Sequence, residues 1–233
     1  MSILKADQVS YSYRTRYRTV PVLKEISCSF ELGKLYAIVG RSGSGKTTFL
    51  SLLAGLDLPD EGQVIYNGVA TSQLNRDRYR QNDVSIVYQA FHLFPLLTAL
   101  ENVMYPMELQ GIKAPVARKQ AKEWMNLVGL SVESEKQYPK MMSGGEQQRV
   151  AIARALASQA KVILADEPTG NLDTENSQNI MGILTKLAHQ EGRCVILITH
   201  DQEIAAQADV LLPLKDGKMG ETDTRSEKSI GEI

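Results

Sequence analysis

The segment GRSGSGKT at 40–47 has the residue types and the spacing needed to hold a chain of phosphates. It fits the pattern G-x-x-x-x-G-K-[ST], in which the glycines let successive backbone N–H groups point into one concavity. Lys46 then reaches the β- and γ-phosphate oxygens, and the hydroxyl of Thr47 binds Mg²⁺. We therefore expect a bound nucleoside triphosphate to contact the loop and the residue after it, namely Gly40, Arg41, Ser42, Gly43, Ser44, Gly45, Lys46, Thr47 and Thr48.

A second set of polar residues follows the apolar run in KVILADEPTG at 161–170. A buried strand would deliver Asp166 to its carboxyl end, where ligands bind in open α/β sheets, and the carboxylate could hold Mg²⁺ through water. Neighbouring strand residues point to opposite sides, so the strand must end for Glu167 to reach the same site, and Pro168 fits such an end. Two adjacent carboxylates suit two roles, one neutralised by metal and the other orienting and deprotonating the attacking water.

Two further polar residues close apolar strand patterns, His200 in VILITH and Gln89 in VSIVYQ. If the first of these strands lies beside the one that carries Asp166, the imidazole could hydrogen-bond a γ-phosphate. The Gln89 amide could touch Mg²⁺ or the lytic water. Taken alone, each residue would be no more than a polar strand end.

The aromatic residues near the N-terminus offer a platform for the base. An aromatic face stacks on a base without reading its edges, which makes Tyr13 a candidate for adenine. Tyr11 lies on the same face of the expected strand, so spacing does not choose between the two. The basic run RTRYR at 14–18 could be a nucleic-acid patch, but a solvated hairpin turn is the favoured interpretation.

The stretch MMSGGEQQRVAIARAL at 141–156 provides a second end suited to an anion. Ser143, Gly144 and Gly145 precede a helical pattern, and a helix N-terminus has free N–H groups and a positive dipole end. Either this helix folds back over the phosphate loop of its own chain, or it binds the nucleotide of a second copy. In the second case a self-complementary dimer buries two triphosphates, forms with ATP and loosens after hydrolysis.

Elements that position these residues can be read from the hydrophobic pattern. The first 90 residues read mainly as short strands with turns. Strands that are apolar along their whole length and alternate with helices indicate a buried parallel sheet, and the helical block at about 98–159 would be an inserted lobe. The polar end at 220–233 is expected to lack structure. Strands are expected at 3–13, 22–30, 34–40, 63–68, 84–89, 161–166 and 193–200, helices at 48–56, 98–111, 114–130, 141–156 and 176–190, and a hairpin with an Asp-Gly turn at 209–219.

Composition narrows the class of protein. A chain of 233 residues forms one domain or two closely packed lobes, and its net charge of −1 gives no bulk attraction to nucleic acid or anionic lipid. Cys28 and Cys194 lie far apart and are expected to be reduced structural thiols. No signal peptide is evident, and the apolar runs are far shorter than the ~18 residues of a membrane helix. We expect the chain not to cross a membrane unaided.

The chain closely resembles the ATP-binding-cassette (ABC) ATPases, because six of its motifs match those of the family in order and spacing. They are GRSGSGKT, Gln89, MSGGEQQR at 142–149, VILADEP at 162–168, GNLD at 170–173 and His200. The resemblance covers about residues 1–220. It implies an α/β fold, a P-loop NTPase cassette with a RecA-like core at about 1–90 and 160–220. An N-terminal antiparallel β subdomain, an inserted helical lobe at 98–159 and a polar tail at 221–233 would complete it. It also implies ATP and Mg²⁺ as cofactors, and hydrolysis in a nucleotide sandwich.

The same resemblance implies residue roles. It assigns the adenine stack to Tyr13, the general base to Glu167, and coupling at the dimer centre to Asp173. Met142 stands where leucine is usual and Glu146 where glutamine is common, but both keep the size and neither removes a phosphate donor. The full implied sets are Glu167, His200, Lys46 and Gln89 for catalysis, Thr47, Gln89 and Asp166 for the metal, and Ser143, Gly144, Gly145 and Glu146 for ATP of the second copy.

Within the family, DEPTGNLD and VSIVYQAFHLFPLLTALENV look most like the lipoprotein-releasing and MacB-type (macrolide or antimicrobial-peptide export) cassettes. These bacterial proteins power a separate permease. The implied partners are a second copy, a permease docking near residues 90–104 and an extracytoplasmic adaptor, with no nucleic acid. The implied location is the cytoplasmic face of the membrane. The apolar residues at 91–97 would dock the permease, pack between the lobes, or do both.

Two other functions would use the same ATP site. One is an ATP-gated regulator of a membrane protein in cell division, which transports nothing. The other is a soluble ABC protein of DNA repair or translation. The short distance between Lys46 and Ser143 leaves no room for a long coiled coil, and the neutral charge also disfavours the last function.

Overall fold

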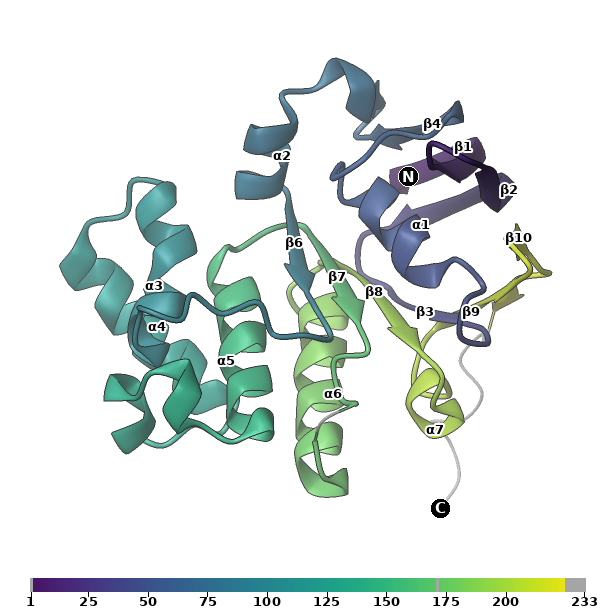
Figure 1. Cartoon of the computed structure of the whole chain (residues 1–233). Helices are drawn as coiled ribbons and strands as arrows, with labels where there is room; N and C mark the ends of the chain where they lie inside the picture. Colours follow the sequence, from purple (N-terminus) through teal and green to yellow (C-terminus); the bar gives the residue numbers. More distant parts are fainter. Residues whose placement is uncertain (1, 171, 225–233) are drawn as a thin grey trace.

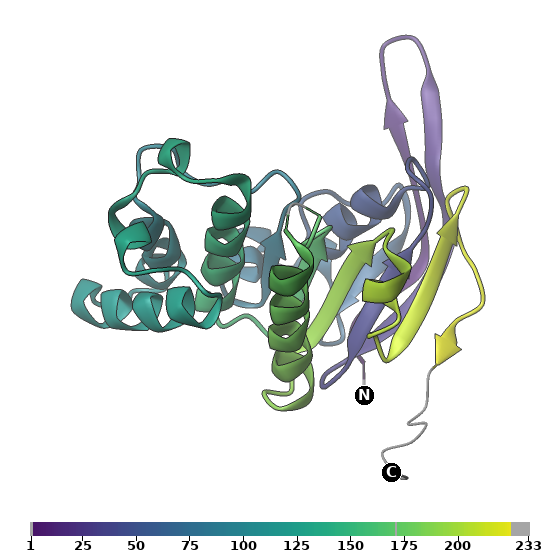
Figure 2. The same cartoon turned by 90° about the horizontal axis from the view of Figure 1, so that it is seen from below.

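The computed structural model describes residues 2–170 and 172–224, and it contains a four-stranded and a seven-stranded sheet (Figure 1). The four-stranded sheet is antiparallel, in the order β2-β1-β4-β5. Its long β1–β2 hairpin extends outward from the rest of the chain (Figure 2). These strands are β1 (Ser2–Arg14), β2 (Thr19–Glu31), β4 (Glu61–Tyr66) and β5 (Val69–Ala70).

The seven-stranded sheet has the order β10-β9-β3-β8-β7-β6, and β11 also pairs with β9. The strands from β9 to β6 run parallel, so their carboxyl ends share one edge. Because both faces are covered, these strands read as continuous apolar runs. They are β3 (Leu35–Val39), β6 (Val84–Val87), β7 (Val162–Asp166), β8 (Cys194–Thr199), β9 (Val210–Lys215), β10 (Lys218–Met219) and β11 (Asp223–Thr224).

Helices α3, α4 and α5 lie toward one end of the molecule, with α3 and α4 farthest from the four-stranded sheet, whereas α1 lies beside that sheet and α7 beside β8 (Figures 1 and 2). Capping boxes begin two of them: Thr98 with Glu101 starts α3, and Ser143 with Glu146 starts α5. The α-helices are α1 (Lys46–Leu53), α2 (Arg76–Asn82), α3 (Ala99–Leu109), α4 (Ala114–Leu127), α5 (Gly144–Ala157), α6 (Thr174–His189) and α7 (Gln202–Ala205). Short 3₁₀ turns are η1 (Thr71–Gln73), η2 (Glu133–Lys136) and η3 (Pro139–Met141).

The core consists of two clusters on opposite faces of the large sheet. Alternate residues of β7 divide between them: Ile163 and Ala165 pack in the cluster that holds the buried faces of α3 to α6. Val162 and Leu164 pack in the cluster that holds α1 and the antiparallel sheet. This alternation follows from the period of two in a strand.

The structure confirms the expected α/β cassette fold and the 209–219 hairpin, whose strands β9 and β10 pair in antiparallel fashion. Helix α2 was not predicted, because its sequence RDRYRQN is polar and buries only Tyr79. Asn75 starts this helix by accepting a hydrogen bond from the Arg78 N–H. The predicted boundaries of the two lobes stay a prediction.

The expectation that residues 220–233 lack structure was wrong for 223–224. Asp223 and Thr224 form β11 and pair with Leu211 and Val210 of β9, whose edge would otherwise leave backbone groups without partners. The remainder of the predicted tail, 225–233, lies outside the described residues. Among residues 2–170 and 172–224 no helix combines the length and the apolar character that membrane crossing requires.

Candidate functional site

The predicted phosphate loop joins β3 to α1 at the shared edge of the parallel sheet. Gly45 must be glycine, because its φ is +101° and an added Cβ would lie 2.7 Å from Cδ2 of Leu23. Gly40 is constrained by contact, since a Cβ there would lie 2.2 Å from the carbonyl oxygen of Leu214. Buried residues of α1, including Phe49, anchor the helix that follows. The loop conformation is therefore fixed by its packing.

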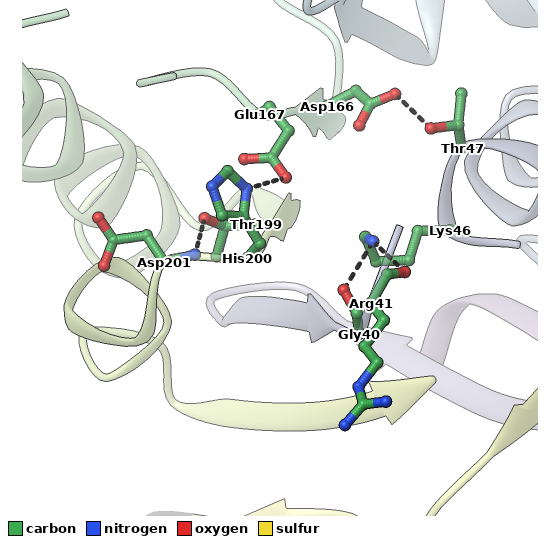
Figure 3. A network of polar contacts seen from close by, with 9 residues as sticks. All are labelled: Gly40, Arg41, Lys46, Thr47, Asp166, Glu167, Thr199, His200 and Asp201. Carbon is green, nitrogen blue, oxygen red and sulfur yellow. Dashed lines mark hydrogen bonds and ion pairs between the residues drawn. The ribbon is translucent and has the colours of Figure 1, made fainter. Parts of the chain in front are cut away.

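Lys46 folds back over the loop that precedes it (Figure 3). Its Nζ donates to the carbonyl oxygens of Gly40, at 2.8 Å, and Arg41, at 3.1 Å. The ammonium group is thus held at the mouth of the loop, where phosphate oxygens would bind.

Asp166 and Thr47 lie face to face across the same edge (Figure 3). The Thr47 hydroxyl donates to Oδ2 of Asp166 at 2.8 Å. Burial raises the pKa of Asp166, and the bond from Thr47 partly opposes this effect. Two hard oxygen donors beside an open cavity suit Mg²⁺, which binds one or two protein oxygens and takes its other ligands from phosphates and water. These two residues, with Gln89, would hold the ion.

Glu167 reaches the site because the chain turns sharply after β7. Its φ of +49° is left-handed, which is uncommon for a residue with a side chain. The Glu167 N–H donates to the carbonyl oxygen of Ile198 at 3.0 Å and holds the turn against β8. The strand therefore ends where the sequence required, and the two carboxylates occupy the same side.

His200 follows β8, the neighbour of β7 in the sheet. Its Nδ1 lies 2.7 Å from Oε1 of Glu167 (Figure 3). This hydrogen bond is the main reason that the pKa of His200 is raised. The His200 side chain is 75% exposed, whereas the Glu167 side chain is 12% exposed. A largely exposed imidazole thus contacts the more sheltered carboxylate.

A cavity of about 650 Å³ connects these groups. Tyr13 lines it from β1, and its hydroxyl lies 3.1 Å from Oγ1 of Thr48. Tyr11 packs edge-on against Tyr13, but its hydroxyl donates a hydrogen bond to the carboxylate of Asp57. The cavity is lined by Tyr13, Val22, Ser42, Gly43, Gly45, Lys46, Thr47, Thr48, Gln89, Asp166, Glu167 and His200.

Some predicted site residues lie elsewhere. Gly40, Arg41 and Ser44 instead line a second cavity of about 600 Å³, which shares Ser42, Gly43 and His200 with the first. The end of α5, from Ser143 to Glu146, and Asp173 at the start of α6 are absent from both linings. Asp173 caps α6 by accepting from the Asn176 N–H at 2.8 Å.

Sequence reasoning missed two contributors. Val22 of β2 lines the main cavity, and nothing distinguishes it from other apolar strand residues. Arg154 of α5 is the other, since its guanidinium binds the loop that follows Gln89. A lone charge inside the apolar run AIARAL was the available signal.

Comparison with known proteins agrees with this geometry. Residues 23–170 match the family described as ABC transporter. The uncharacterized ABC transporter ATP-binding protein YclH of Bacillus subtilis is 44% identical over 93% of this chain and 95% of its own. The lipoprotein-releasing system ATP-binding protein LolD of Bordetella avium is 41% identical over 93% and 95%.

Solved structures give the same result. A dimeric structure of MJ0796, titled a bacterial ABC transporter cassette, has a TM-score of 0.92 and 35% identity over 97% of this chain and 100% of that chain. A second structure of MJ0796, with the same TM-score, is titled a post-hydrolysis state bound to ADP and Pi. The chain therefore belongs to the ABC transporter family. It is an ATP-binding subunit and an ATPase.

Proposed function

We propose that two copies of this chain close head to tail around two Mg²⁺–ATP and thereby drive a separate permease. The observation that carries this proposal is the position of Ser143. The cavity gathers Lys46, Asp166 and Glu167, but the Ser143 end of α5 lies outside it and is exposed. A helix N-terminus suited to phosphate is thus left open for the nucleotide of another copy.

Within each site the chain's own groups divide the work. The loop amides and Lys46 bind the phosphates, and bound Mg²⁺ would supply charge neutralisation beside Thr47, Gln89 and Asp166. Glu167 orients and deprotonates the attacking water as general base. His200 already lies beside this carboxylate, so it is placed to hydrogen-bond the γ-phosphate.

The dimer would bring Ser143, Gly144, Gly145 and Glu146 of one copy to the phosphates of the other. The similarity to MJ0796, whose structures are titled dimeric, supports this arrangement. Asp173 starts α6 with an exposed carboxylate and would couple the two sites at the dimer centre. Because the two-fold contact is self-complementary, each copy both gives and receives a phosphate-binding end.

The permease would dock at residues 90–104. Leu93 packs against the core, whereas Leu96 is 87% exposed and Phe94 is 40% exposed, so this segment has both an inner and an outer apolar side. Beside it lies a mainly apolar cavity of about 320 Å³, which Tyr105 and Leu109 of α3 help to line. An exposed apolar segment next to an apolar hollow suits a partner helix.

We further propose the cargo class from the relatives. LolD of Bordetella avium is named for lipoprotein release, which favours that function here, with export of drugs or antimicrobial peptides as the related possibility. The chain would then act at the cytoplasmic face of the membrane through its permease, with an extracytoplasmic adaptor and without nucleic acid.

A pull-down tests the proposal. Tagged Glu167→Gln protein is incubated with detergent-solubilised membranes and ATP, and captured proteins are identified by mass spectrometry. The matched control adds Lys46→Ala to remove ATP binding. A permease with a large extracytoplasmic domain, captured only by the first protein, is expected. Capture of a division protein, or of no membrane protein, would overturn the transport role while leaving the ATPase intact.

A further inference from the structure

The guanidinium of Arg154 points from α5 into the loop that follows Gln89. It donates to the carbonyl oxygen of His92 at 2.7 Å and to that of Phe91 at 2.9 Å. Its Cζ also lies 5.9 Å from the centre of the Phe94 ring, within range of a cation–π contact. One side chain of α5 thus contacts three residues of the loop, Phe91, His92 and Phe94.

This arrangement is not an ordinary ion pair. None of the ion pairs found in residues 2–170 and 172–224 includes Arg154. The guanidinium is half-buried, and this burial lowers its pKa. Its compensation comes from the two loop carbonyls and the aromatic ring, so Arg154 and the loop depend on each other.

The loop itself is held in an uncommon conformation. Phe91 and His92 have consecutive left-handed φ values of +50° and +49°, and neither is glycine. Such residues persist only where their surroundings hold them. His92 stacks on Tyr88 with ring centres 4.6 Å apart. Arg154 therefore binds the carbonyl oxygens of Phe91 and His92, the two residues whose left-handed conformation must be stabilised by their surroundings.

The other end of the loop is tied to α3. The Phe94 N–H donates to Oδ1 of Asn102 at 2.8 Å, and the Asn102 amide donates to the carbonyl oxygens of Phe94, Leu97 and Thr98. Between these ties the loop borders both cavities, with Gln89 in the ATP cavity and His92 in the apolar one. Movement of the loop would therefore change the shape of both cavities.

We propose that Arg154 is the positioning residue that makes the loop at 89–97 and helix α5 move as one body. Ser143 lies at the start of the same helix, about 16 Å away at 1.5 Å per residue. Engagement of Ser143 by the second copy's ATP is thereby transmitted to the docking segment, and docking is transmitted back. This inference rests on the proposed in-trans dimer for its direction, but the local coupling stands on the contacts alone.

Hydrogen exchange of the loop amides provides the test. The amides of Phe94 and Leu97 donate hydrogen bonds in the structure and report on the loop. In the Glu167→Gln chain, ATP is expected to slow exchange at 88–98. Adding Arg154→Lys keeps the charge but loses the two-pronged donor, so loop exchange should quicken about tenfold or more without nucleotide. The ATP-induced slowing should disappear while dimerisation by light scattering persists.

Two matched variants make the result specific. Arg80 lines the same apolar cavity but binds the carbonyl oxygen of Gly55 and Asp77, so Arg80→Lys should leave loop exchange unchanged. Replacing Phe91 and His92 by glycine in the Arg154→Lys chain relieves the left-handed strain, so a chain that Arg154→Lys alone unfolds should fold again. Rescue of this kind is not expected if Arg154 merely fills the core.

The outcomes separate the two proposals. Persistent ATP-induced slowing in a dimerising Arg154→Lys chain would overturn the role of Arg154. So would a chain that fails to fold with Arg154→Lys and stays unfolded with the glycine pair. Failure of the Glu167→Gln parent to dimerise would instead count against the in-trans site, and the nucleotide-free exchange rates would still decide the local coupling.

Discussion

Ser143 and Glu146 bind each other at the start of α5. Oε2 of Glu146 accepts from the Ser143 N–H at 2.9 Å and from its hydroxyl at 2.8 Å, while the Glu146 N–H donates to the Ser143 hydroxyl at 3.3 Å. A phosphate of the second copy would need the Ser143 hydroxyl as a hydrogen-bond donor. That hydroxyl already donates to the Glu146 carboxylate of its own helix. Bringing a phosphate beside this carboxylate adds like-charge repulsion.

That repulsion makes dimerisation depend on the charge of Glu146. In the Glu167→Gln background, Glu146→Gln should lower the ATP concentration needed for half-maximal dimerisation by about fivefold, because glutamine keeps the capping box and removes the charge. The control is Glu101→Gln, since Glu101 makes the same contacts with Thr98 at 2.8, 2.8 and 3.3 Å. An equal shift in both variants, measured by light scattering, would contradict the explanation.

The general base is tested by Glu167→Gln alone. Turnover should fall by at least ~10²-fold, the scale of a lost general base, while ATP binding is retained. The ATP-bound dimer should accumulate. Phosphate release and light scattering measure the two effects, and turnover near that of the unaltered chain would show that another group activates the water.

Removal of the Lys46 ammonium should abolish ATP binding. Lys46→Ala deletes the cation at the mouth of the phosphate loop, so affinity measured by calorimetry should fall at least about tenfold. Its fold should survive, because among residues 2–170 and 172–224 the hydrogen bonds of the Lys46 ammonium go to loop carbonyls. An unchanged dissociation constant would refute the phosphate-loop assignment.

The choice between the two tyrosines can be made by substitution. Tyr13 lines the ATP cavity, so Tyr13→Ala should weaken ATP binding by about tenfold through lost stacking, while Tyr13→Phe should not. Tyr11→Ala removes the contact with Asp57 and should affect stability more than affinity. The reverse order of affinities would assign the adenine to Tyr11.

The contact between His200 and Glu167 makes stability depend on pH. The folded-state pKa of His200 is raised above 6.5, chiefly by Glu167, with Asp201 adding to the effect and Lys46 opposing it. A raised pKa means that the contribution is complete below the unfolded value and is lost as pH rises through the folded value. The Tm difference between the unaltered chain and His200→Gln should therefore be largest below the ordinary histidine pKa of about 6.5 and should shrink as pH rises through the raised folded-state value. Glu167→Gln should abolish this pH dependence.

Much of the site was predictable because its residues depend on local rules. The phosphate loop follows from glycine spacing, and Asp166 and His200 follow from apolar strands that share one edge. The left-handed turn at Glu167 could be inferred only as a requirement, since no glycine marks it. Arg154 and α2 escaped prediction because tertiary contacts, not sequence periodicity, give them their place.

The alternation of β7 between two core clusters has a mechanical consequence. Ile163 and Leu164 belong to different clusters, yet both lie just before Asp166 on one rigid strand. A change in side-chain volume on either face of the sheet would shift β7 and, with it, the carboxylates of Asp166 and Glu167. Residues far from the nucleotide, in either layer, can thus tune ATP hydrolysis without touching it, and neither layer is free to vary independently of the other.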